Sequence, residues 1–158
     1  MSWVTVSLRK MTLKNRINNL ESELIRISQR LQTVANNESY NQQADQLNHN
    51  YQIAAMNAAY NDTISKIDTN TNGDNQKQLA AQKNIMTATN NYNSAMQMED
   101  SIFNAKNTAR QHMVDAQTNA LEAQQEQVEA QIKAARAEYE SLGEAMDQDI
   151  KDGAIKLV

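Results

Sequence analysis

The sequence contains no cysteine and no proline, and only three of its 158 residues are glycine. The lack of cysteine excludes a disulfide framework, a thiolate metal site and a thiol nucleophile. Aromatic residues make up 4% of the chain, and folds built from β-sheets need more strand formers and turn residues than are present. No run of about 18 apolar residues occurs, so the sequence predicts no transmembrane helix.

The abundant residues favour helices. The chain holds 21 alanines, 20 asparagines and 17 glutamines, and its apolar residues recur with helical periodicity. This periodicity argues against a disordered chain, and the length favours one domain. Composition names no activity and no substrate.

Charge is distributed unevenly along the chain, although the formal net charge is only -4. Residues 1–30 carry an excess of basic side chains, and residues 119–158 carry an excess of acidic ones. We expect these two ends to attract each other, within one chain or between neighbouring copies. The basic stretch is short and has one aromatic residue, so it does not predict binding to nucleic acid.

The clearest pattern lies in residues 13–34, where aliphatic residues alternate spacings of four and three. This heptad seam would lie along one face of a helix and requires a partner helix. Val6 and the aliphatic stem of Lys10 extend it towards the N-terminus. Its members are Leu13, Ile17, Leu20, Leu24, Ile27, Leu31 and Val34.

Two further stripes repeat this spacing. The C-terminal seam consists of Leu121, Gln125, Val128, Ile132, Ala135, Tyr139, Leu142 and Met146. A smaller stripe in the first half consists of Tyr40, Ala44, Leu47, Tyr51, Ala54 and Ala58, and its alanines would allow a neighbouring helix to approach closely. Residues 36–39 could end one helix and cap another, which leaves a three-helix arrangement as the alternative.

The strongest break is the cluster of turn formers at residues 68–75. Asn72 or Gly73 can adopt the left-handed conformation that ends a helix, and Asp74 or Asn75 can cap the next helix.

The sequence therefore predicts an all-α fold, a long antiparallel helical hairpin with coiled-coil packing. We expect one elongated domain with arms at about 4–68 and 76–150, a turn at 69–75 and a frayed tail at 151–158. A turn at residue 72 places His49 opposite Ala95.

The same turn resembles the first half of an EF-hand calcium loop, with Asp68, Asn70, Asn72 and Asp74 as candidate oxygen ligands. The twelfth position of such a loop holds a bidentate glutamate, but Leu79 occupies it here. We interpret the segment as an Asx-rich turn, with at most weak calcium affinity, and predict no metal centre.

No arrangement of catalytic residues is apparent. The pairs Asp45–His49 and His112–Asp115 are each about one helical turn apart, a spacing that is more typical of solvent-facing hydrogen bonds than of ligands. No Glu-x-x-His motif, phosphate-binding loop or activated serine is present. We therefore expect neither an enzyme nor a cofactor.

The N-terminus is a short amphipathic and basic segment formed by Trp3, Val4, Leu8, Arg9 and Lys10. It could lie on a membrane surface or serve as a docking or export segment. The alternative is that Trp3 packs on the acidic C-terminal arm. The segment lacks the apolar core of a Sec signal, so we expect a cytoplasmic protein or one exported by a signal-less route.

The two seams, the central turn and the Asn/Gln/Ala-rich composition resemble bacterial type III export substrates that polymerise, such as needle and filament subunits and the terminal helices of flagellins. The resemblance covers the architecture of the whole chain and implies a subunit that assembles through paired helices. Phage and virion scaffolding proteins share these features.

A two-helix hairpin shields each seam position only partly, so we expect association into a homo-oligomer. The sequence favours a non-catalytic structural protein, a self-associating subunit of a filament, secretion appendage or virion-type assembly. The first alternative is a coiled-coil adaptor or export chaperone that binds another helical protein. The second is a peripheral membrane protein that uses its N-terminus.

Overall fold

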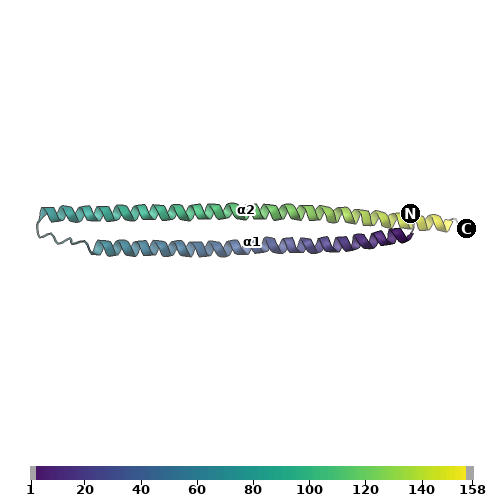
Figure 1. Cartoon of the computed structure of the whole chain (residues 1–158), viewed down its shortest axis with the longest axis horizontal. Helices are drawn as coiled ribbons and strands as arrows, with labels where there is room; N and C mark the ends of the chain where they lie inside the picture. Colours follow the sequence, from purple (N-terminus) through teal and green to yellow (C-terminus); the bar gives the residue numbers. More distant parts are fainter. Residues whose placement is uncertain (1–2, 156–158) are drawn as a thin grey trace. The chain divides into compact units, whose positions relative to one another are not determined.

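The structure, a computed structural model, describes the backbone of residues 3–155 and the side chains of residues 3–151. Helix α1 spans Trp3–Ser65, helix α2 spans Asn75–Ile155, and residues 66–74 connect them. The two helices pack against each other, and residues 3–155 contain no strand (Figure 1). The predicted all-α helical hairpin is therefore confirmed.

Helix α1 continues through residues 36–39, so the break considered there does not occur and the three-helix alternative is wrong. This stretch contains neither proline nor glycine, and Glu38 within it pairs with Arg110 of α2. Helix α2 extends into the segment expected to be a frayed tail as far as Ile155. Residues 156–158 of that segment lie outside the described residues.

The chain divides into two compact units, and each unit contains part of both helices. Unit 1 comprises Met1–Ala35 and Asp115–Val158, whereas unit 2 comprises Asn36–Val114. Within each unit the helices are antiparallel. Arg9 pairs with Glu138 and Glu21 pairs with Arg136 in unit 1, and Glu38 pairs with Arg110 and His49 with Glu99 in unit 2.

Unit 1 contains an aliphatic core between the two helices. Its central cluster joins residues of both seams, and three further residues pack against it at the edge. Burial of such side chains is the main favourable contribution to folding. The cluster consists of Leu20, Ile27, Leu121, Val128 and Ile132, with Leu24, Leu31 and Val34 packed against them.

Ion pairs flank this core. Arg9 contacts Glu138 at 2.6 Å, so part of the attraction expected between the basic and acidic ends is realised within the chain. A second pair of opposite polarity joins Arg136 to Glu21, also at 2.6 Å. All four side chains are largely exposed, so each pair contributes little to stability.

Unit 2 contains the connection between the helices. Asn72 and Gly73 both have positive φ angles, of 45° and 79°, and Asp74 caps α2 by accepting hydrogen bonds from the backbone N–H groups of Gln76 and Lys77 at 2.9 and 3.3 Å. The predicted left-handed residues and the predicted cap are confirmed.

The predicted register is wrong by about one helical turn, because His49 faces Glu99 and Asp100 rather than Ala95. The connection explains the difference. Its residues Ile67 and Asp68 line the same groove as Ala81 of α2, so the loop runs beside the first turns of that helix (Figure 1). An extended residue covers about twice the length of a helical one, so α1 can end well before the level at which α2 begins.

Candidate functional site

The helix contact in unit 2 is polar where that of unit 1 is aliphatic. Glu38, Asp45 and His49 of α1 all pair with residues of α2. Glu38 lies four residues after Val34 and Asp45 lies seven residues after Glu38, so both continue the spacing of the N-terminal seam. Polar side chains thus occupy inward positions that leucine and isoleucine hold in unit 1.

Arg110 of α2 is the centre of the first polar cluster. Its Nε donates to Glu38 Oε1 at 3.1 Å, its Nη2 donates to Asn107 Oδ1 at 2.7 Å, and its Nη1 donates to Asp45 Oδ2. The Arg110 side chain is only 10% exposed. A planar guanidinium held by several acceptors fixes the relative position of both helices.

Asp45 also accepts a hydrogen bond from Lys106 Nζ at 2.6 Å. This bond, reinforced by the positive charges of Lys106 and Arg110, holds the pKa of Asp45 below its ordinary value, although burial of the carboxylate acts in the opposite direction. Glu38 Oε2 is buried and has no hydrogen-bond partner within the described residues. Glu38 therefore depends on its single bond to Arg110.

His49 forms the second polar contact. It is one of only two buried residues in the described part of unit 2, the other being Ala81. Its Nδ1 lies 3.3 Å from Glu99 Oε1, its Nε2 lies 3.5 Å from Asp100 Oδ1, and its ring stacks on that of Phe103. The interpretation of Asp45–His49 as a solvent-facing pair is wrong, because His49 is buried and Asp45 is bonded to Lys106 and Arg110.

These polar groups contact one another across the two helices. A carboxylate faces each ring nitrogen of His49, and the Asp45 carboxylate is bonded to the side chains of Lys106 and Arg110. Residues 3–151 bring together no group of three or more histidine, aspartate or glutamate side chains that could hold a metal ion. Paired polar groups inside a helix contact instead set the register of the helices, because any slip leaves buried charges without partners.

The thirteen residues expected to form the assembly seam are all buried or half-buried in unit 1. Eight of them belong to the core cluster between α1 and α2 or pack against it. The structure thus uses the seam within the chain. The thirteen are Leu13, Ile17, Leu20, Leu24, Ile27, Leu31, Val34, Leu121, Val128, Ile132, Tyr139, Leu142 and Met146.

The N-terminal residues divide into two groups. Trp3, Val4 and Leu8 are exposed, so the alternative in which Trp3 packs on the C-terminal arm does not occur. The basic residues are engaged: Arg9 pairs with Glu138, and the Lys10 ammonium lies 4.7 Å from the centre of the Tyr139 ring.

The calcium-ligand candidates of the connection take part in turn geometry. Asp68 Oδ1 accepts a hydrogen bond from the backbone N–H of Asn70 at 2.9 Å, and Asp74 Oδ1 caps α2. Asn72 supplies a left-handed residue. These are the bonds of an Asx-rich turn that joins two helices.

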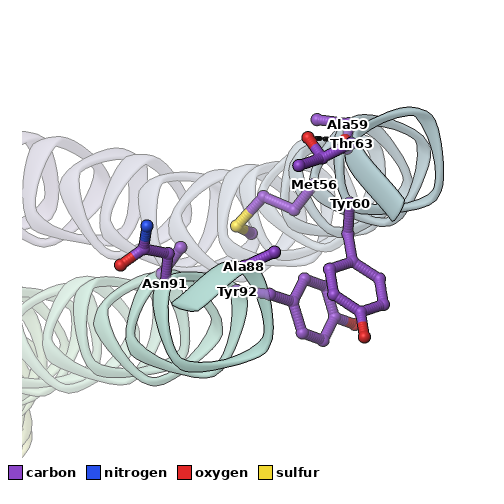
Figure 2. Close-up of a pocket in the computed structure, with 8 residues that line it drawn as sticks. Met56, Ala59, Tyr60, Thr63, Ala88, Asn91 and Tyr92 are labelled. Carbon is purple, nitrogen blue, oxygen red and sulfur yellow. Dashed lines mark hydrogen bonds between the residues drawn. The ribbon is translucent and has the colours of Figure 1, made fainter. Parts of the chain in front are cut away.

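An open groove of about 240 Å³ lies near the connection in unit 2 (Figure 2). The rings of Tyr60 and Tyr92 lie beside it with centroids 4.7 Å apart and planes tilted by 31°, and the Tyr60 hydroxyl lies 3.0 Å from Thr89 Oγ1. Three of its lining residues are alanines, whose small side chains leave space for the groove, and none of its residues is charged. It is lined by Met56, Ala59, Tyr60, Thr63, Ala88, Asn91, Tyr92 and Ala95.

The small stripe of the first half faces outward. We call it the outer stripe: Tyr40, Ala44, Leu47, Tyr51, Ala54 and Ala58. All six residues are exposed, because Glu38, Asp45 and His49 occupy the face of α1 that contacts α2. Periodicity alone did not reveal this orientation. Extending the spacing of the N-terminal seam past Val34 would have identified Glu38 and Asp45 as the inward residues.

No family model matches the chain, and no curated protein and no solved structure is significantly similar to it. Within the described residues, neither helix contains a stretch that is both long and apolar enough to cross a bilayer.

Proposed function

We propose that the chain is a non-catalytic structural protein, a self-associating coiled-coil subunit of a filament, secretion appendage or virion-type assembly. The observation that carries this proposal is the distribution of large apolar side chains. The hairpin fills its aliphatic seam within unit 1, yet large apolar residues on the outer faces of α1 and α2 stay exposed. Exposed apolar residues that recur along one helix face are typical of association surfaces.

The contents of the helix contact support the same function. The polar residues of this contact pair across the two helices. His49 faces Asp100, and Asp45 is bonded to Lys106 and Arg110, so these groups hold α1 against α2. A pair of helices held in register by such contacts within unit 2 suits a building block that repeats. The resemblance to polymerising export substrates points to the same class.

Light scattering across a concentration series, with negative-stain microscopy of the same samples, tests the proposal. Growth into filaments or regular particles is the expected result. A fixed dimer or tetramer without growth would favour the alternative of an adaptor or export chaperone. A particle of 17.8 kDa at every concentration would contradict self-association altogether.

The exposed Trp3, Val4 and Leu8 favour a second candidate, binding to a membrane surface. Arg9 and Lys10 are engaged by Glu138 and Tyr139, which leaves fewer free cations to contact lipid headgroups. Flotation with anionic liposomes, compared between the natural chain and Trp3→Ala, distinguishes this candidate from self-assembly.

A further inference from the structure

The outer stripe of α1 in unit 2 combines large apolar residues with a surface that has no formal charge. Tyr40, Leu47 and Tyr51 are 73%, 60% and 74% exposed. Between residues 39 and 61 the acidic and basic side chains are Asp45, which is 15% exposed, and His49, which is buried, and both contact α2. The outward face of this stretch therefore consists of tyrosine, leucine, alanine, asparagine and glutamine.

We infer that this face binds the same face of a second copy, with the two α1 helices antiparallel across a twofold axis level with residue 49. This inference rests on the proposed self-association and names the contact that forms its first dimer. Because a twofold contact closes at two copies, growth into a filament requires a further interface on the dimer. In that arrangement Ala44 lies level with Ala54 of the second copy, Leu47 with Tyr51, and Tyr40 with Ala58. Large residues thereby meet small ones at the ends of the stripe, as an isologous contact requires.

Charge identifies a second copy as the occupant. The chain has a net charge of -4, so two copies repel each other on average. The outer stripe brings no like charges together, and its asparagines and glutamines can form hydrogen bonds at the rim. A partner with a strongly charged docking surface would find no ion pairs here.

The size of the stripe is sufficient for a specific contact. A tyrosine presents about 200 Å² of surface, so the exposed parts of two copies of the stripe together supply on the order of 1,000 Å². The sparse packing of unit 2 is consistent with a need for this cover, because His49 and Ala81 are its only buried residues among those described.

Disulfide cross-linking tests the arrangement, and the absence of cysteine removes any background. Tagged Ala44→Cys is mixed with untagged Ala54→Cys under mild oxidation. The antiparallel contact predicts the mixed 44–54 dimer as the main product, because two copies of residue 44 would lie about 15 Å apart along the axis. Ala123→Cys, an exposed alanine of unit 1, is the matched control.

Homodimers of Ala44→Cys and of Ala54→Cys without the mixed product would overturn the antiparallel arrangement. No product above the Ala123→Cys level, with a natural chain that sediments above 17.8 kDa, would overturn this interface and leave the proposed self-association standing. A natural chain that is monomeric throughout would overturn both. Tyr51→Lys provides a second check: the dissociation constant should rise at least about tenfold while helicity is unchanged.

Discussion

The imidazole of His49 lies flat on the ring of Phe103, with ring centroids 4.1 Å apart and an angle of 14° between the planes. His49 comes from α1 and Phe103 from α2, so this stack joins the two helices of unit 2 where aliphatic contacts are few. The carboxylates of Glu99 and Asp100 face the two ring nitrogens. The contact therefore combines ring stacking with polar contacts to two carboxylates.

A double-mutant cycle should detect this stack. We expect Phe103→Leu, which keeps most of the side-chain volume, to lower the free energy of unfolding by about 1 kcal/mol. The coupling to His49→Gln should be about 0.5–1.5 kcal/mol, because the two rings contact each other directly. Chemical denaturation of the four proteins measures it. A coupling near zero would show that the stack does not stabilise unit 2.

Arg110→Met should be markedly more damaging than Arg136→Met. Removal of Arg110 leaves Glu38 without its hydrogen-bond donor and weakens the pairing of Asp45, and we expect a loss of about 1–2 kcal/mol. Arg136 pairs with Glu21 in an exposed position, so its loss should cost less than about 0.5 kcal/mol. Equal effects in urea unfolding would contradict the structural role of the Arg110 cluster.

Acid should destabilise the protein partly through Asp45. Because the folded-state pKa of Asp45 is lowered, its contribution to stability is complete above the unfolded-state value of about 4 and is lost as pH falls through the folded-state pKa. The free energy of unfolding should therefore decline below about pH 4. Asp45→Asn should show a shallower decline over the same range. Parallel pH profiles for the two proteins would contradict the assignment.

The aliphatic core of unit 1 gives a fourth stability comparison. Leu13 is 2% exposed, and Leu13→Ala should lower the free energy of unfolding by about 3 kcal/mol. Met11, two residues earlier on the same helix, is exposed, and Met11→Ala should change it by less than about 0.5 kcal/mol. Thermal unfolding at low protein concentration separates the two. A similar melting temperature for both variants would place the core elsewhere.

The sequence predicted the two seams from the alternating spacing of four and three, and it predicted the capped turn from the cluster of turn formers at residues 68–75. It did not predict which way the outer stripe faces. Apolar periodicity alone marks the outer stripe as a surface that contacts another helix. In unit 2, however, the positions that face α2 hold Glu38, Asp45 and His49. Only the partners Arg110 and Glu99, which are far away in the sequence, make those positions favourable.

The register was missed for a different reason. A symmetric turn about residue 72 assumes equal lengths of chain on both sides of the bend. The connection instead runs beside Ala81 at the start of α2, and this displaces the level at which His49 meets α2. The path of an irregular loop depends on its packing, which sequence spacing does not encode.

Sedimentation equilibrium of the natural chain, Leu47→Lys and Ile25→Lys tests the central claim most directly. Leu47 and Ile25 lie on the same helix and are 60% and 59% exposed, so they form a matched pair. We predict that the natural chain and Ile25→Lys associate with rising concentration, whereas Leu47→Lys stays near 17.8 kDa. A natural chain that remains at that mass up to about 100 μM, well above the dissociation constants of specific interfaces, would contradict the account.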